Sequence, residues 1–93
     1  MIRHVVAWSM RPEAEGELDS LLAELRAMLA QIEEIRALSA GPLLNESSLD
    51  AALCVDLEDA EALERYRVHP VHQPVAGRLR EVAAEVVVAD YEL

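Results

Sequence analysis

Residues 66–72 read Tyr66-Arg67-Val68-His69-Pro70-Val71-His72, and this stretch organises the second half of the chain. Pro70 has no amide hydrogen to donate, and a proline pushes the residue before it out of the helical region. Pro70 therefore divides the last helical region into two helices, with His69 at the break. The stretch also holds two of the three histidines and one of the two tyrosines. Because acid–base side chains of this kind are scarce elsewhere, we expect function to centre here.

The segments on either side of this stretch show helical and then extended patterns. Asp59 is a suitable N-cap for a helix that begins at Ala60. After Pro70, apolar side chains recur at helical spacing, at Val75, Leu79, Val82 and Ala83. Over residues 86–93, one set of side chains (Val86, Val88, Asp90) alternates with another (Val87, Ala89, Tyr91). This alternation predicts a closing strand.

The N-terminal part predicts a strand followed by a long helix. Over residues 2–10, one face carries Ile2, His4, Val6 and Trp8. Both faces hold apolar residues, which suits a sheet covered on both sides. Pro12 opens a helix, and because Gly16 weakens its first turn we expect the regular helix to begin a few residues late. An apolar stripe then steps by three and four through Leu18, Leu21, Leu22, Leu25, Met28, Leu29 and Ile32.

Residues 35–57 predict an antiparallel hairpin. Residues 35–44 form a less regular strand with a break or bulge at Gly41-Pro42. Residues 49–57 form a strand that is apolar on both faces as far as Asp56. Between them, Asn45-Glu46-Ser47-Ser48 is rich in turn-forming side chains and predicts a short exposed connection. Two strands with so short a link pair antiparallel.

The predicted order is strand, helix, strand, strand, split helix, strand. With right-handed crossovers, this order gives a four-stranded antiparallel sheet with helices on one face, the ferredoxin-like α+β fold, in a single domain over residues 1–93. The second face of the sheet also carries apolar side chains, Val5 and Ala7 among them, and 53% of all residues are apolar. Helices on one face cannot cover the other, so we expect a homodimer in which two sheets face one another.

Composition limits the kinds of partner and the compartment. The net charge is −10, from 18 acidic residues against 8 arginines, without lysine. Nucleic acid requires a basic stripe and an anionic membrane requires clustered cations, so we expect neither partner. No run approaches the roughly 20 apolar residues of a membrane span, and Arg3 and His4 interrupt any signal peptide, so we expect a cytoplasmic protein. The lone Cys54 can form no intrachain disulfide and reads as a small buried hydrophobe.

Several stretches together resemble the stress-responsive α/β-barrel domain (Dabb) family. They are Ile2-Arg3-His4-Val5-Val6, Ala62-Leu63 with Tyr66, His69-Pro70-Val71-His72, and Val88-Ala89-Asp90-Tyr91-Glu92. The most specific part is the Tyr-x-x-His-Pro-x-His spacing, followed further along by Asp90-Tyr91. The resemblance covers essentially the whole chain, and it implies a dimeric α+β barrel.

Within that family, the sequence has a distant resemblance to olivetolic acid cyclase, a cofactor-free polyketide cyclase whose pocket lies between sheet and helices. The resemblance implies that Tyr66 and His72 carry an aldol condensation and that His4 lines the pocket. The sequence departs from that enzyme at Leu25 and Ala83, where the cyclase has aromatic rings. This departure concerns the substrate rather than the fold.

The residue types of the signature suit proton transfer. A neutral imidazole is a competent general base near pH 7, and a phenol can donate a hydrogen bond to a developing enolate. Across the break at Pro70, Tyr66 and His72 can converge on one cavity. The structural alternative is that His72 caps the last helix or pairs with a backbone carbonyl, while Tyr66 is a core aromatic whose hydroxyl is satisfied.

The other histidines also have structural interpretations. His69, at a helix end, can hydrogen-bond the last carbonyls, so we assign it a structural or secondary role. His4 is either a pocket residue or a satisfied core residue. We expect no metal site, because neither Cys nor a second clustered carboxylate joins the histidines and their spacing matches no zinc pattern. We expect no cofactor either, since the glycines form no phosphate loop or dinucleotide motif.

These observations lead to one main functional hypothesis and two alternatives. We expect an apolar pocket for a small, carbonyl-containing molecule, lined by His4, Val6, Trp8, Leu25, Tyr66, His72, Val75 and Leu79. In an enzyme with cyclase or lyase chemistry, His72 would be the base and Tyr66 would polarise the carbonyl. The alternatives are a stress-related protein that binds a ligand without turnover, and a cofactor-independent monooxygenase, the latter by analogy of architecture alone.

Overall fold

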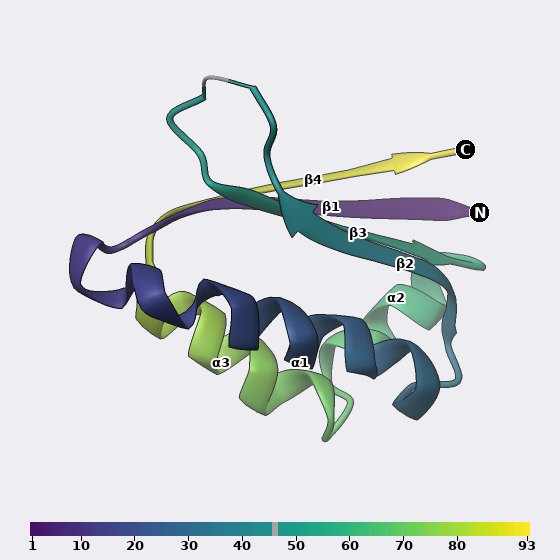
Figure 1. Cartoon of the computed structure of the whole chain (residues 1–93). Helices are drawn as coiled ribbons and strands as arrows, with labels where there is room; N and C mark the ends of the chain where they lie inside the picture. The colour runs from purple at the N-terminus through teal and green to yellow at the C-terminus, as the bar shows by residue number, and fades with distance from the viewer. Residues whose placement is uncertain (46) are drawn as a thin grey trace.

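The computed structural model describes residues 1–45 and 47–93. In chain order the elements are β1 (Ile2–Met10), the 3₁₀ helix η1 (Pro12–Glu17), α1 (Leu18–Gln31), β2 (Ile35–Pro42), β3 (Ala51–Leu57), α2 (Ala60–Arg67), α3 (His72–Val82) and β4 (Ala83–Glu92). The strands form one sheet in the order β2-β3-β1-β4, and every neighbouring pair is antiparallel. All three α-helices lie on one face of the sheet (Figure 1). The predicted ferredoxin-like α+β fold is confirmed.

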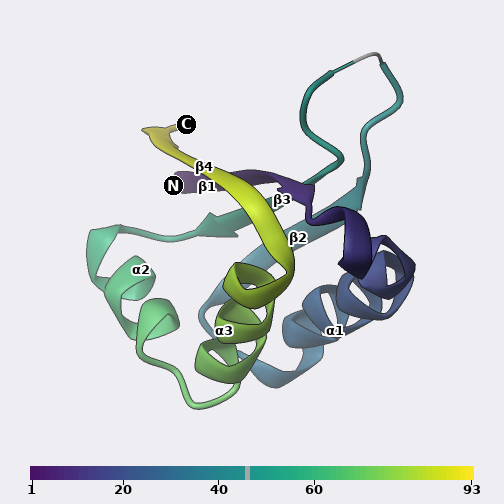
Figure 2. The ribbon, with the colours of Figure 1, turned by 90° about the vertical axis from the view of Figure 1, so that its left-hand side faces the viewer.

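The core forms between the inner face of the sheet and the helices. In β1, the alternating residues His4, Val6, Trp8 and Met10 are buried. His4 pairs with Val55 of β3 on one side and with Asp90 of β4 on the other, and cross-strand partners share a face. The inner face therefore carries His4 and Asp90 side by side. Figure 2 shows that the three α-helices pack against one face of the sheet.

The first helical region begins as the sequence predicts. Pro12 starts a 3₁₀ segment that contains Gly16, and the regular helix follows from Leu18. Its buried residues are Leu21, Leu22, Leu25 and Met28, as expected from the apolar stripe. Leu29 is a correction, because 47% of its surface remains exposed. It lies one residue beyond Met28, a rotation of about 100° that turns it away from the sheet.

Pro70 divides the last helical region as predicted. The side chain of Asp59 accepts a hydrogen bond of 2.8 Å from the backbone N–H of Ala62 and so caps α2. That helix ends at Arg67, residues 68–71 connect, and α3 begins at His72. The break thus places Tyr66 in the last turn of one helix and His72 at the start of the next.

Element boundaries differ from the sequence prediction at three places. β4 begins at Ala83 rather than at residue 86, so Ala83 is not on the helix face; it pairs with Met10 across a bulge between Ser9 and Met10. β2 ends at Pro42, and its irregularity lies between Ile35 and Ala37 rather than at Gly41-Pro42. β3 begins at Ala51, two residues late. Sheet pairing overrides the helix-like composition of residues 83–85. In the predicted turn at 45–48, Glu46 lies outside the described residues.

The outer face of the sheet is open. Val5, Ala7 and Cys54 are half-buried there, so the expectation of a fully buried Cys54 is not met. Val87 and Tyr91 of β4 are 45% and 49% exposed. The described residues between β2 and β3, 43–45 and 47–50, rise above this same face (Figure 1), and Leu44 among them is 99% exposed. Among the described helices, none is long and apolar enough to cross a membrane.

Candidate functional site

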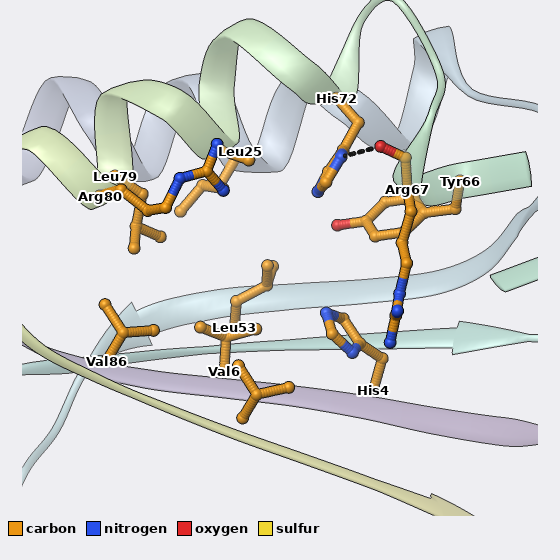
Figure 3. Close-up of a pocket in the computed structure, with 12 residues that line it drawn as sticks. His4, Val6, Leu25, Leu53, Tyr66, Arg67, His72, Leu79, Arg80 and Val86 are labelled. Carbon is orange, nitrogen blue, oxygen red and sulfur yellow. Dashed lines mark hydrogen bonds between the residues drawn. The ribbon is translucent and has the colours of Figure 1, made fainter. Parts of the chain in front are cut away.

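A cavity of about 530 Å³ lies between the inner face of the sheet and the helices. Its wall is formed by His4, Val6, Leu25, Leu53, Tyr66, Arg67, His72, Ala76, Leu79, Arg80, Val86 and Val88. The sheet contributes the lower side and the helices the upper side in Figure 3. This volume is within the range of roughly 300–1,000 Å³ that is typical of small-molecule sites, and most of the wall is aliphatic.

The break at Pro70 brings Tyr66 and His72 together. Their ring centroids lie 4.3 Å apart, with the planes inclined by 45°. Local backbone bonds hold the connection: the N–H of His69 donates to the carbonyl of Tyr66 over 3.2 Å, and the N–H of Gln73 donates to the carbonyl of His69 over 3.1 Å. The two rings are therefore set by a short, hydrogen-bonded segment.

The orientation of His72 determines which of its nitrogens can act as a base. Its Nδ1 lies 3.0 Å from the carbonyl oxygen of Arg67. A carbonyl only accepts, so Nδ1 carries the hydrogen and the lone pair of the neutral ring is on Nε2. Nε2 points into the cavity (Figure 3). Burial lowers the pKa of His72, the positive charges of Arg80 and Arg67 lower it further, and the hydrogen bond to the Arg67 carbonyl opposes them. The ring is thus held in its basic, neutral form near pH 7.

Tyr66 has a buried hydroxyl group that no described residue satisfies by a hydrogen bond. The residue is 0% exposed, and its oxygen has no hydrogen-bond partner among the described residues. Burial raises the pKa of Tyr66 to about 12. The phenol therefore keeps its proton at physiological pH, and the hydroxyl points into the cavity beside His72 (Figure 3). A buried donor without a partner is costly, so this arrangement suits an oxygen atom of a ligand.

His4 reaches the cavity from the opposite wall. Its Nδ1 lies 2.5 Å from Oδ1 of Asp90, its neighbour in β4. An ionised carboxylate only accepts, so Nδ1 donates and Nε2 is left for the cavity. The other oxygen of Asp90 is 3.5 Å from the guanidinium of Arg67. The rings of His4 and Tyr66 meet edge to face with centroids 5.8 Å apart. His4, Tyr66 and His72 therefore converge in a cavity whose other lining residues are aliphatic, apart from Arg67 and Arg80.

The structure brings together six of the eight residues predicted to line a pocket. They are His4, Val6, Leu25, Tyr66, His72 and Leu79. Trp8 and Val75 are corrections, since neither borders this cavity. Trp8 is two residues beyond Val6 in β1 and is fully buried in the core, and Val75 of α3 is half-buried and packs against that core.

Six residues of the wall were not predicted: Leu53, Arg67, Ala76, Arg80, Val86 and Val88. A signal for some of them exists in the sequence. Val86 and Val88 share the alternation of Asp90, and Ala76 and Arg80 follow His72 at intervals of four residues. The register of β4 against β1 sets Val88 opposite Val6. This register is a property of the tertiary structure and cannot be predicted from the local sequence pattern.

His69 is absent from the cavity wall and stabilises the connection. Its Nδ1 accepts a hydrogen bond of 3.1 Å from the backbone N–H of Val71. The predicted structural role fits this contact, but the partner is an N–H group rather than the last carbonyls of the helix. Among the described residues, no group of three or more His, Cys, Asp or Glu side chains is arranged to hold a metal ion.

Comparison with known proteins adds a family and a set of relatives. The model of the stress-responsive A/B barrel domain family matches residues 2–93. A protein of Streptomyces coelicolor, described as uncharacterised, is 34% identical over 97 residues, covering 99% of this chain and 99% of that one.

Solved structures share the fold at low sequence identity. A protein from Bacteroides fragilis, described as dimeric, ferredoxin-like and of unknown function, superimposes with a TM-score of 0.88 at 23% identity, covering 99% of this chain and 95% of that chain. The hydroxynitrile lyase from Passiflora edulis superimposes with a TM-score of 0.89 at 14% identity, covering 99% and 92%. At these identities the likeness concerns the fold.

Proposed function

The chain belongs to the stress-responsive A/B barrel domain (Dabb) family, and on that premise we propose that it is a cofactor-free acid–base enzyme acting on a small apolar carbonyl compound. One observation carries the proposal. The hydroxyl of Tyr66, which has no partner among the residues described, and the lone pair on Nε2 of His72 point into the same largely apolar cavity. A hydrogen-bond donor for a carbonyl oxygen and a base for the adjacent carbon are the two groups that enolate formation needs.

The proposed reaction begins with proton abstraction. The Nε2 atom of His72 takes a proton from the carbon next to the carbonyl, and the electron pair of the broken C–H bond moves onto the carbonyl oxygen. The hydroxyl of Tyr66 donates a hydrogen bond to that oxygen. In a cyclase, the enolate carbon then attacks a second carbonyl of the same chain, and the imidazolium returns its proton to the new alkoxide. A positioned base contributes about 10²–10⁴-fold to the rate.

Similarity to two enzymes supports the proposed cyclase or lyase chemistry. The signature from Tyr66 to His72 resembles that of olivetolic acid cyclase, which supports a polyketide-like substrate. A hydroxynitrile lyase has the same fold, which supports including a lyase in the proposal. The aliphatic wall, with Leu25 and Leu53, favours a substrate with an alkyl rather than an aromatic body.

The test uses poly-β-keto thioesters and two histidine variants. We expect turnover above the uncatalysed background for the wild-type protein and a loss of about 10²–10⁴-fold for His72→Ala. His69→Ala is the matched control, since its ring belongs to the same signature and does not border the cavity. The absence of wild-type turnover, or full activity of His72→Ala, would reject an enzyme of this kind.

Binding without turnover is the second candidate. The observation in its favour is the bond from His72 to the Arg67 carbonyl, which a purely structural histidine would also make. Native mass spectrometry of freshly purified protein separates the two functions. A retained ligand that is released unchanged, together with no turnover, supports a binding protein.

We further propose that the protein is a cytoplasmic homodimer joined through the open face of the sheet. Val87 and Tyr91 are exposed on that face, and Leu44, in the segment that follows β2, is 99% exposed. Structures of the same fold from Bacteroides fragilis and other bacteria are described as dimeric, which supports this arrangement. Burying this apolar face against a second copy would give the cavity a rigid floor.

A further inference from the structure

Arg80 is the one arginine without a protein partner among the described residues. The other seven each donate a hydrogen bond to, or pair with, a carboxylate or a backbone carbonyl. The chain has 18 acidic residues against 8 arginines, so acidic partners are abundant. Arg80 nevertheless borders the cavity and pairs with none of the acidic residues that the structure describes.

The side chain of Arg80 extends along α3 toward His72, one of the two residues proposed to act on the ligand. His72, Ala76 and Arg80 are four residues apart and lie on one face of α3, so eight residues, or about 12 Å of helix, separate the ends. Long side chains on a helix lean toward its N-terminus. The guanidinium of Arg80 accordingly extends toward His72 above the cavity (Figure 3). The short side chain of Ala76 leaves the space between them free.

The rest of the wall offers no comparable place for an anion. Val6, Leu53 and Val86 are aliphatic, and burial of a carboxylate against such groups is costly without a paired charge. The second guanidinium, of Arg67, is already shared between Glu64 and Asp90, each 3.5 Å away. A negatively charged group in this cavity would therefore lie at Arg80.

We propose that Arg80 binds the carboxylate of the ligand, so that this cavity takes an oxo acid with an alkyl body. Arg80 is then a specificity-determining residue, and the ligand spans from its guanidinium to the hydroxyl of Tyr66. This inference rests on the proposed function, because it takes the ketone at Tyr66 as the other end of the ligand. A guanidinium presents a planar pair of donors that matches a carboxylate.

The experiment compares 4-oxononanoate with its methyl ester by isothermal titration calorimetry. The two probes share the ketone and the alkyl chain, and only the acid carries the charge. We expect the wild-type protein to bind the acid about tenfold more tightly than the ester. Arg80→Gln should remove this preference while the affinity for the ester stays the same, and Arg80→Lys should retain part of it.

Arg36→Gln is the matched control. It makes the same change in net charge, but Arg36 pairs with Glu58 outside the cavity wall, so the preference for the acid should persist. Equal binding of acid and ester by the wild type, or an unchanged preference in Arg80→Gln, overturns the role of Arg80 and leaves the proposed function standing. Failure of both probes to bind overturns the inference together with the carbonyl-binding function.

Discussion

The ring of His72 stacks at an incline on the ring of Tyr66, with centroids 4.3 Å apart, although the two residues belong to different helices. In an uninterrupted helix, residues six positions apart are rotated by about 240° and project in different directions. The break at Pro70 removes this separation. The site therefore depends on the interruption between α2 and α3 rather than on either helix alone.

The hydroxyl of Tyr66 is predicted to serve function at a cost in stability. It is buried and has no partner among the described residues, and an unsatisfied buried polar group costs about 1–3 kcal/mol. Tyr66→Phe should therefore leave the free energy of unfolding unchanged or raise it, while turnover falls about 10²–10³-fold. Chemical denaturation and steady-state kinetics measure the two effects.

The other tyrosine supplies the control for that variant. Tyr91 lies on the exposed outer face of the sheet, so Tyr91→Phe should leave turnover unchanged. A marked loss of stability in Tyr66→Phe would show that the hydroxyl has a structural partner and would contradict its role as a donor to the ligand.

The pH dependence of the free energy of unfolding should report the lowered pKa of His72. Burial, with the positive charges of Arg80 and Arg67, lowers this pKa, whereas an unfolded histidine titrates at about 6.5. Below that value the unfolded state binds more protons, so the free energy of unfolding should fall as the pH drops from about 6.5 to the folded pKa of His72. Above pH 6.5 His72 is neutral in both the folded and the unfolded state, so its contribution to the pH dependence of the free energy of unfolding vanishes.

The pH dependence of activity should also follow the titration of His72. The acid limb of kcat/KM should have its midpoint below about 6.5, because the neutral imidazole is the base. An NMR titration of the His72 ring checks the pKa directly, and Arg80→Gln should raise it by removing one positive charge. A midpoint at or above 6.5 would exclude this assignment of the base.

Asp90 is predicted to hold His4 in place. The carboxylate accepts a hydrogen bond of 2.5 Å from Nδ1 of a histidine that is only 8% exposed. Asp90→Asn should lower the free energy of unfolding by about 1–3 kcal/mol, the range for a hydrogen bond to a charged group. Glu92→Gln on the same strand is exposed and should change it by less than about 0.5 kcal/mol. Equal effects of the two substitutions on the free energy of unfolding would show that Asp90 does not hold His4 in place.

The cavity itself can be tested by filling it. Ala76 lies between His72 and Arg80 on α3, and Ala76→Leu should occupy the ligand's space. We expect loss of 4-oxononanoate binding in calorimetry with a melting temperature at or above that of the wild type, because a larger apolar side chain fills empty volume. Ala27→Leu, on the exposed side of α1, is the control and should bind normally. Undiminished binding by Ala76→Leu would locate the ligand elsewhere.

The open face of the sheet should be the dimer interface. Val87 on that face and Leu29 on α1 are almost equally exposed, at 45% and 47%. Val87→Glu should shift the protein to monomers in sedimentation equilibrium, since an unpaired charge is costly in an apolar interface. Leu29→Glu makes the same kind of change on the helical side and should stay dimeric. A wild-type protein that is monomeric at micromolar concentration would contradict the proposed interface.

Much of the fold was predictable because its signals are local. The alternation of His4, Val6 and Trp8 identified the inner face of β1, and Asp59 and Pro70 marked where helices begin and end. The start of β4 at Ala83 was not predictable, because residues 83–85 have a helix-like composition and become a strand only by pairing with β1. The exposure of Leu29 likewise depends on how α1 is rotated against the sheet.

The amino-acid sequence by itself determined the order of elements, the break between two helices and the presence of Tyr66 and His72 on either side of it. Those features follow from backbone preferences and from the period of apolar side chains, which act over a few residues. Only the tertiary structure decided that the hydroxyl of Tyr66 has no partner among the described residues, that Asp90 contacts His4, and that Arg80 borders the cavity. These depend on strand register and helix placement, which bring together side chains as far apart in the chain as His4 and Asp90.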